Sequence, residues 1–80
     1  MKNVIRNIRE NMELSQADFA AMLGVGTQTI FDIEHYNRVQ INDKVLDVLD
    51  NELDYDRSEI VGKYQKGRKD KRLQLIEDNK

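Results

Sequence analysis

The chain has 80 residues, of which 39% are hydrophobic and 35% are charged, so it can form one small domain with a single core. It contains no cysteine and only one histidine, which excludes disulfides, thiolate metal sites and most Ser-His or Cys-His catalysis. No apolar segment approaches the roughly 20 residues that span a membrane. We therefore expect a protein of a reducing compartment that is not an enzyme and uses no metal or cofactor.

Charge is distributed unevenly along the chain. Residues 1–62 contain six basic and twelve acidic residues, a net charge of −6, whereas residues 63–80 contain seven basic and three acidic residues, a net charge of +4. We interpret residues 63–80 as a basic C-terminal tail or helix extension. Its basic run could be a flexible tail, could neutralise phosphates, or could belong to a helix that packs on another subunit through an apolar cluster. That cluster consists of Leu73, Leu75 and Ile76.

Apolar spacing and capping residues predict the first two helices. The apolar positions of the first helix recur every three or four residues, at Val4, Ile5, Ile8 and Met12. The segment from Ser15 to Asp18 resembles a capping box at the start of the second helix. Gly24 lies just past the apolar face of that helix, where a positive φ can close it.

A short connection leads to a third helix, predicted over residues 27–36. Residues 24–26 separate it from the second helix, which is the length of the turn in a helix-turn-helix motif. Gly26 can serve as its N-cap, and Ile30 and Ile33 face inward. We expect Asn37 to adopt the left-handed conformation at the exit.

Two further helices are predicted beyond a polar linker. The fourth could begin after Asn42 and has inward positions at Val45, Leu46, Leu49 and Leu53. Asp56 or Ser58 could cap the fifth, whose apolar positions are Ile60, Val61 and Tyr64. Gly67 interrupts this pattern. The sequence therefore predicts an all-α chain of five helices.

Residues 5–61 resemble the helix-turn-helix domain of the phage repressor and Cro family, also called Xre-like. Two stretches carry most of the resemblance: residues 14–25, Leu-Ser-Gln-Ala-Asp-Phe-Ala-Ala-Met-Leu-Gly-Val, and residues 29–34, Thr-Ile-Phe-Asp-Ile-Glu. The resemblance implies a five-helix, lambda-repressor-like DNA-binding domain over residues 1–62, with its third helix in the major groove. It also implies a largely buried ion pair between Arg9 and Glu34.

The same resemblance implies contacts with DNA at the starts of the second and third helices. Gln16 should hydrogen-bond a phosphate, helped by the N-terminus of its helix. Thr27 and Gln28 should reach base edges, since Gln can pair bidentately with adenine and the Thr methyl can touch thymine. Members of the family usually bind as homodimers to two half-sites about one helical turn apart.

Phe31, Asp32 and Arg38 complete the candidate DNA-binding residues. Phe31 has three interpretations: a core residue, a contact with sugar or a thymine methyl, or part of a protein-binding patch. Asp32 would repel phosphate unless it accepts a hydrogen bond from a cytosine amino group. Arg38 lies in the segment after the third helix, where the family usually carries Lys or Arg.

Two functions fit these features. We favour a sequence-specific transcriptional regulator, a small phage-type repressor or Cro-like protein that binds double-stranded operator DNA as a homodimer. The alternative is an antirepressor or antitoxin-like protein that covers another regulator with its recognition-helix face and acidic surface. Either would act in the cytoplasm of a bacterial or phage-infected cell, without a membrane partner.

Overall fold

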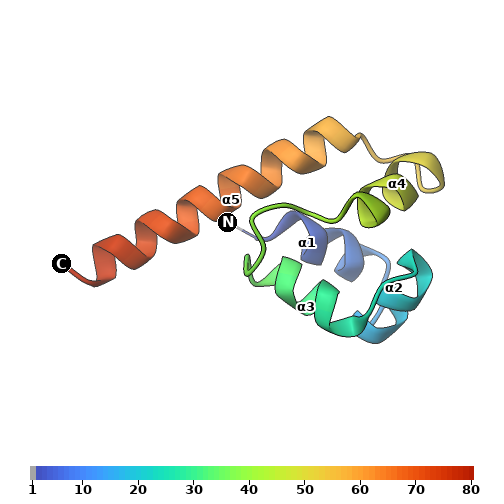
Figure 1. Ribbon diagram of the computed structural model, residues 1–80, viewed down its shortest axis with the longest axis horizontal. Helices are drawn as coiled ribbons and strands as arrows, with labels where there is room; N and C mark the ends of the chain where they lie inside the picture. The colour runs from blue at the N-terminus through green and yellow to red at the C-terminus, as the bar shows by residue number, and fades with distance from the viewer. Residues whose placement is uncertain (1) are drawn as a thin grey trace.

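The computed structural model describes residues 2–80, and over that range the chain folds into five α-helices without a strand (Figure 1). The helices are α1, Val4–Asn11; α2, Gln16–Leu23; α3, Thr27–Glu34; α4, Asp43–Asn51; and α5, Arg57–Asp78. The predicted all-α fold of five helices is confirmed.

Local sequence determines where the helices begin and end. Asn3, Ser15 and Asp56 are the N-caps of α1, α2 and α5, and each side chain accepts a hydrogen bond from a backbone N–H in the first turn. Gly24 ends α2 with a φ of 74°, as its position predicted. Asn42 precedes α4, but its side chain accepts a hydrogen bond from Arg38 instead of capping the helix.

One hydrophobic core holds the helices together. α2 packs on α3 and α4, while α5 packs on α1 and α4. Burial of each large apolar side chain contributes about 1.5–3 kcal/mol to folding. The buried hydrophobic residues are Ile5, Ile8, Phe19, Ala20, Leu23, Ile30, Ile33, Ile41, Val45, Leu46, Leu49, Ile60 and Tyr64.

The exit from α3 differs from the prediction. The helix ends at Glu34, and the left-handed residue is Tyr36, with a φ of 57°, not Asn37. The N–H groups of Tyr36 and Asn37 donate to the carbonyls of Ile33 at 3.1 Å and Asp32 at 2.8 Å. This is a Schellman motif with tyrosine in the position that glycine usually takes. The conformation costs roughly 1–2 kcal/mol for an L-residue, and packing of the Tyr36 ring against α5 offsets that cost.

Gly67 does not interrupt the fifth helix, contrary to the sequence prediction. It is buried inside α5, and a Cβ at this position would overlap the phenol of Tyr36. α5 therefore continues through residues 63–78 and extends beyond the other helices (Figure 1). None of the helices in residues 2–80 is both long and apolar enough to cross a membrane.

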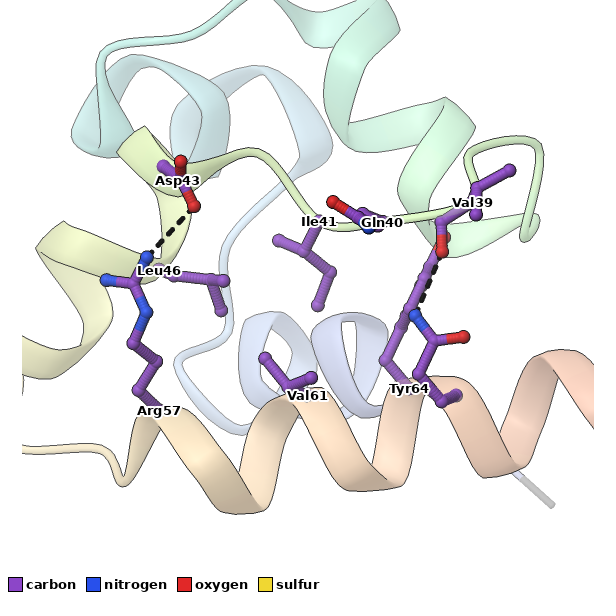
Figure 2. A pocket seen from close by; sticks show the side chains of 9 residues that line it. Val39, Gln40, Ile41, Asp43, Leu46, Arg57, Val61 and Tyr64 are labelled. Atoms are coloured by element: carbon purple, nitrogen blue, oxygen red, sulfur yellow. Dashed lines mark hydrogen bonds and ion pairs between the residues drawn. The ribbon is translucent and has the colours of Figure 1, made fainter.

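A groove of about 530 Å³ lies between α5, α4 and the segment that precedes α4 (Figure 2). Val61, grouped by sequence with the inward residues of α5, lines this groove and is 37% exposed. Ile41 and Leu46 form the apolar floor, and Asp43 pairs with Arg57 at one end (Figure 2).

Candidate nucleic-acid interface

A buried ion pair fixes α3 relative to α1. The guanidinium of Arg9 donates to both carboxylate oxygens of Glu34, at 2.8 Å from Nε and 3.0 Å from Nη2. The Glu34 side chain is only 2% exposed. The hydrogen bond from Arg9 to Glu34 raises the pKa of Arg9 above the usual value, so the guanidinium remains charged. The Arg9–Glu34 pair implied by the resemblance is therefore present, and its role is to orient the helix-turn-helix.

Gln16, the first residue of α2, lies beside this ion pair. Its amide nitrogen donates to Glu34 Oε1 at 3.3 Å, and the residue is half-buried. This bond uses one of the two N–H groups of the amide, and the second remains available to an acceptor such as a phosphate oxygen. The start of α2 is thus held close to the C-terminal end of α3.

Thr27 and Gln28 occupy the first turn of α3, and both are exposed. The amide nitrogen of Gln28 donates to Asp32 Oδ1 at 2.9 Å, one helical turn further on. The bond leaves Oε1 and one N–H of the Gln28 amide without a partner in residues 2–80. An amide donor and an amide acceptor are the groups that recognise adenine in the major groove.

The carboxylate of Asp32 is surrounded by donors, so its charge on this face is partly compensated. In addition to Gln28, the amide of Asn37 donates to Asp32 Oδ1 at 3.4 Å. Arg38 Nη2 lies 3.9 Å from Asp32 Oδ2, and its Nη1 donates to Asn42 at 3.1 Å. The structure therefore brings Gln28, Asp32 and Arg38 into one polar cluster at the exposed side of α3.

Phe31 belongs to the surface and not to the core. Its side chain is 40% exposed and stacks on the ring of His35, with ring centroids 4.0 Å apart. The core interpretation of Phe31 is therefore wrong, because the buried side of α3 is occupied by Ile30 and Ile33. The Phe31–His35 pair forms an exposed aromatic surface next to Asp32.

Two residues outside the predicted set complete the end of α3. Asn37 bonds to Asp32 as described, and Lys71 of α5 donates from Nζ to the carbonyl of His35 at 2.6 Å. The sequence drew attention to Lys71 only as one cation in a basic run. Its contact with α3 depends on the path of α5, which residue spacing alone does not give.

The part of the chain that the structure describes, residues 2–80, contains no candidate metal site. No three His, Asp or Glu side chains there are grouped so as to hold a metal ion.

An exposed third helix, a short turn and a buried ion pair behind them define the chain as a DNA-binding helix-turn-helix regulator. Comparison with known proteins agrees, because a family model described as helix-turn-helix matches residues 5–60, well over half of the chain. The chain therefore belongs to this family, the Xre-like, lambda-repressor type of helix-turn-helix. No curated protein and no solved structure gave a significant match.

Proposed function

We propose that this protein is a sequence-specific transcriptional regulator of the small phage repressor or Cro type, with α3 in the major groove of its operator. The observation that carries the proposal is the exposed start of α3, where Asp32 holds the Gln28 amide at 2.9 Å. A preoriented amide at the start of a recognition helix loses less side-chain entropy when it binds a base edge.

The other candidate residues support the same docking. Gln16 contacts a phosphate at one edge of the groove with its free N–H, and Thr27 lies beside Gln28 to touch a neighbouring base. Arg38 follows the exit of α3, where it contacts the backbone while neutralising Asp32. Phe31 touches sugar or a thymine methyl from the adjoining surface. Bound in this way across a promoter, the protein blocks transcription by occlusion.

A homodimer on two half-sites about one helical turn apart is part of this proposal. The C-terminal end of α5 supports it, because this end extends beyond the other helices (Figure 1) and carries apolar side chains exposed by 44–53%. Such side chains are a suitable surface for a second copy. They are Leu73, Leu75 and Ile76.

A second candidate function, an antirepressor or antitoxin-like protein, is favoured by Phe31. An aromatic side chain that is 40% exposed beside a carboxylate resembles the anchor of a protein interface. The acidic charge of residues 1–62 would also attract the basic DNA-binding face of another regulator.

Binding to DNA from upstream of the protein's own gene tests the first function against the second. We expect the purified protein to bind this duplex more tightly than a scrambled duplex of equal length, with affinity that falls as salt rises. If neither duplex binds at low salt while a basic regulator does, the antirepressor function replaces the regulator.

A further inference from the structure

The segment of α5 from Lys63 to Arg72 carries nearly half of the basic residues of an otherwise acidic protein. Between Lys63 and Arg72 there are six basic residues and one acidic residue, Asp70. In residues 2–80, Lys63 is the only one of the six with a carboxylate within ion-pair distance, Glu59 at 2.8 Å. Within the same range the other five cations have no carboxylate partner, and they repel one another.

Hydrogen bonds to main-chain carbonyls fix this basic segment against the exit of the recognition helix. Tyr64 donates from its hydroxyl to Arg38 O at 2.8 Å, and Gln65 donates from its amide to Val39 O at 2.9 Å. Lys71 donates to the carbonyl of His35, the C-cap of α3. This basic segment of α5 is therefore held against the C-terminal end of α3 and against the segment that contains Arg38.

Helical spacing places two of the cations on the same stripe of α5 as Gln65. Gln65, Arg68 and Arg72 follow one another at intervals of three and four residues, so they lie along one stripe of the helix. Because Gln65 bonds to Val39, the stripe begins beside the segment that follows α3 and continues toward the C-terminal end of α5. Arg68 Nη1 also donates to Gln65 Oε1 at 3.1 Å, which holds its guanidinium in the stripe.

Two lysines on the other side of the same helix provide a comparison. Lys63 lies beside α1, where it lines a small hollow with Asn7 and Asn11. Lys66, three residues further on, lies on the same side of α5 as Lys63. These two cations are exposed, as Arg72 is, but they do not belong to the stripe of Gln65, Arg68 and Arg72.

We propose that Arg68 and Arg72 form a phosphate-binding ridge that extends the DNA interface beyond Arg38. This proposal rests on the proposed function and adds a second element, α5, to the helix-turn-helix contacts. In the proposed docking, with α3 in the major groove, we expect the DNA backbone at the exit of α3 to pass the segment that α5 covers. Guanidinium groups bind phosphate oxygens well because their N–H groups match the geometry of the anion. The ridge gives an acidic protein local affinity for a polyanion.

Salt dependence of DNA binding tests the ridge with charge-matched variants. We would measure the dissociation constant for the upstream duplex and its scrambled control between about 50 and 200 mM salt. The variants are Arg68→Gln with Arg72→Gln, and, as control, Lys63→Gln with Lys66→Gln. Both lose two positive charges from α5, and circular dichroism checks that each stays folded.

We expect the ridge variant to reduce the slope of log affinity against log salt by about 0.9 per lost phosphate contact, and thus by about 1.8. It should weaken binding to both duplexes by the same factor, because phosphate contacts carry no sequence information. The control should change the slope by less than half as much. Equal losses in the two variants would instead indicate a general effect of net charge and would overturn the ridge.

Two other outcomes also overturn the proposal, and they differ from each other. If the unaltered protein binds no duplex, the proposed function fails together with the ridge. Binding to polyglutamate is measured in parallel. If the unaltered protein binds both the duplex and polyglutamate, but the ridge variant loses affinity only for polyglutamate, the ridge binds an acidic polypeptide and the regulator function survives.

Discussion

The phenol ring of Tyr36, which follows the end of α3, packs directly on the backbone of α5 at Gly67. The same ring contacts Tyr64 with centroids 5.2 Å apart. Tyrosine at a left-handed position and glycine inside a helix are each unfavourable, but here each makes room for the other. The pair connects the exit of α3 to the basic half of α5.

Alanine at the two glycines of α5 should have opposite effects on stability. Gly67→Ala should lower the free energy of unfolding by about 1–3 kcal/mol, because the new methyl group overlaps Tyr36. Gly62→Ala should raise it by up to about 1 kcal/mol, because a Cβ there meets no atom within 4 Å and alanine favours helix. Urea denaturation measures both. Stabilisation by both substitutions would show that Tyr36 does not pack on Gly67.

Removal of a buried guanidinium should lower the free energy of unfolding far more than removal of an exposed guanidinium on the same helix. Arg9→Ala leaves the Glu34 carboxylate, 2% exposed, without its cation and should cost about 3–5 kcal/mol. Arg6→Ala breaks an exposed pair with Glu10 and should cost less than about 1 kcal/mol. Chemical denaturation of the two variants gives the comparison, and similar losses would be inconsistent with the ion pair as a buried clamp.

Phe31→Ala should cost little stability, although phenylalanine is large. Its side chain is 40% exposed and contacts His35, so we expect a loss below about 1 kcal/mol. The neighbouring Ile30→Ala, at a fully buried position, should cost about 2–5 kcal/mol. Thermal or urea unfolding distinguishes them. A loss for Phe31→Ala as large as that for Ile30→Ala would place the ring in the core.

Gln28→Ala should weaken specific DNA binding by about 1–3 kcal/mol, because one bidentate base contact is lost. Gln74→Ala is the matched control, since Gln74 makes an equivalent hydrogen bond to Asp78 four residues on but lies near the end of α5. It should leave affinity unchanged. Fluorescence anisotropy with a labelled duplex measures both affinities, and an unchanged affinity for Gln28→Ala would remove Gln28 from the reading residues.

Short-range sequence patterns predicted most of the helices, but they could not predict side-chain contacts between segments that are distant in the sequence. Ser15, Gly24 and Asp56 act within one turn of their own helix, so their roles could be inferred from neighbouring residues. The left-handed position was assigned to Asn37 because asparagine tolerates it best in isolation. The partner that makes Tyr36 favourable there is Gly67, and no short-range pattern connects the two.

The candidate site shows the same division. Exposure of the start of α3 follows from the apolar positions of that helix, so Thr27 and Gln28 were predictable as surface residues. The compensation of Asp32 by Gln28, Asn37 and Arg38 requires the tight Schellman exit, which the sequence did not reveal. Asp32 therefore looked more repulsive to phosphate in the sequence than it is in the fold.

Selection from random-sequence DNA is the sharpest test of sequence-specific binding, because it assumes no particular operator. The purified protein would be mixed with random duplexes, and the retained DNA would be amplified and sequenced over several rounds. Sequence-specific binding by a dimer predicts an enriched inverted repeat with half-site centres about 10 base pairs apart. Retention of DNA without a shared sequence, or no retention at low salt, would contradict the assignment of this protein as a sequence-specific regulator.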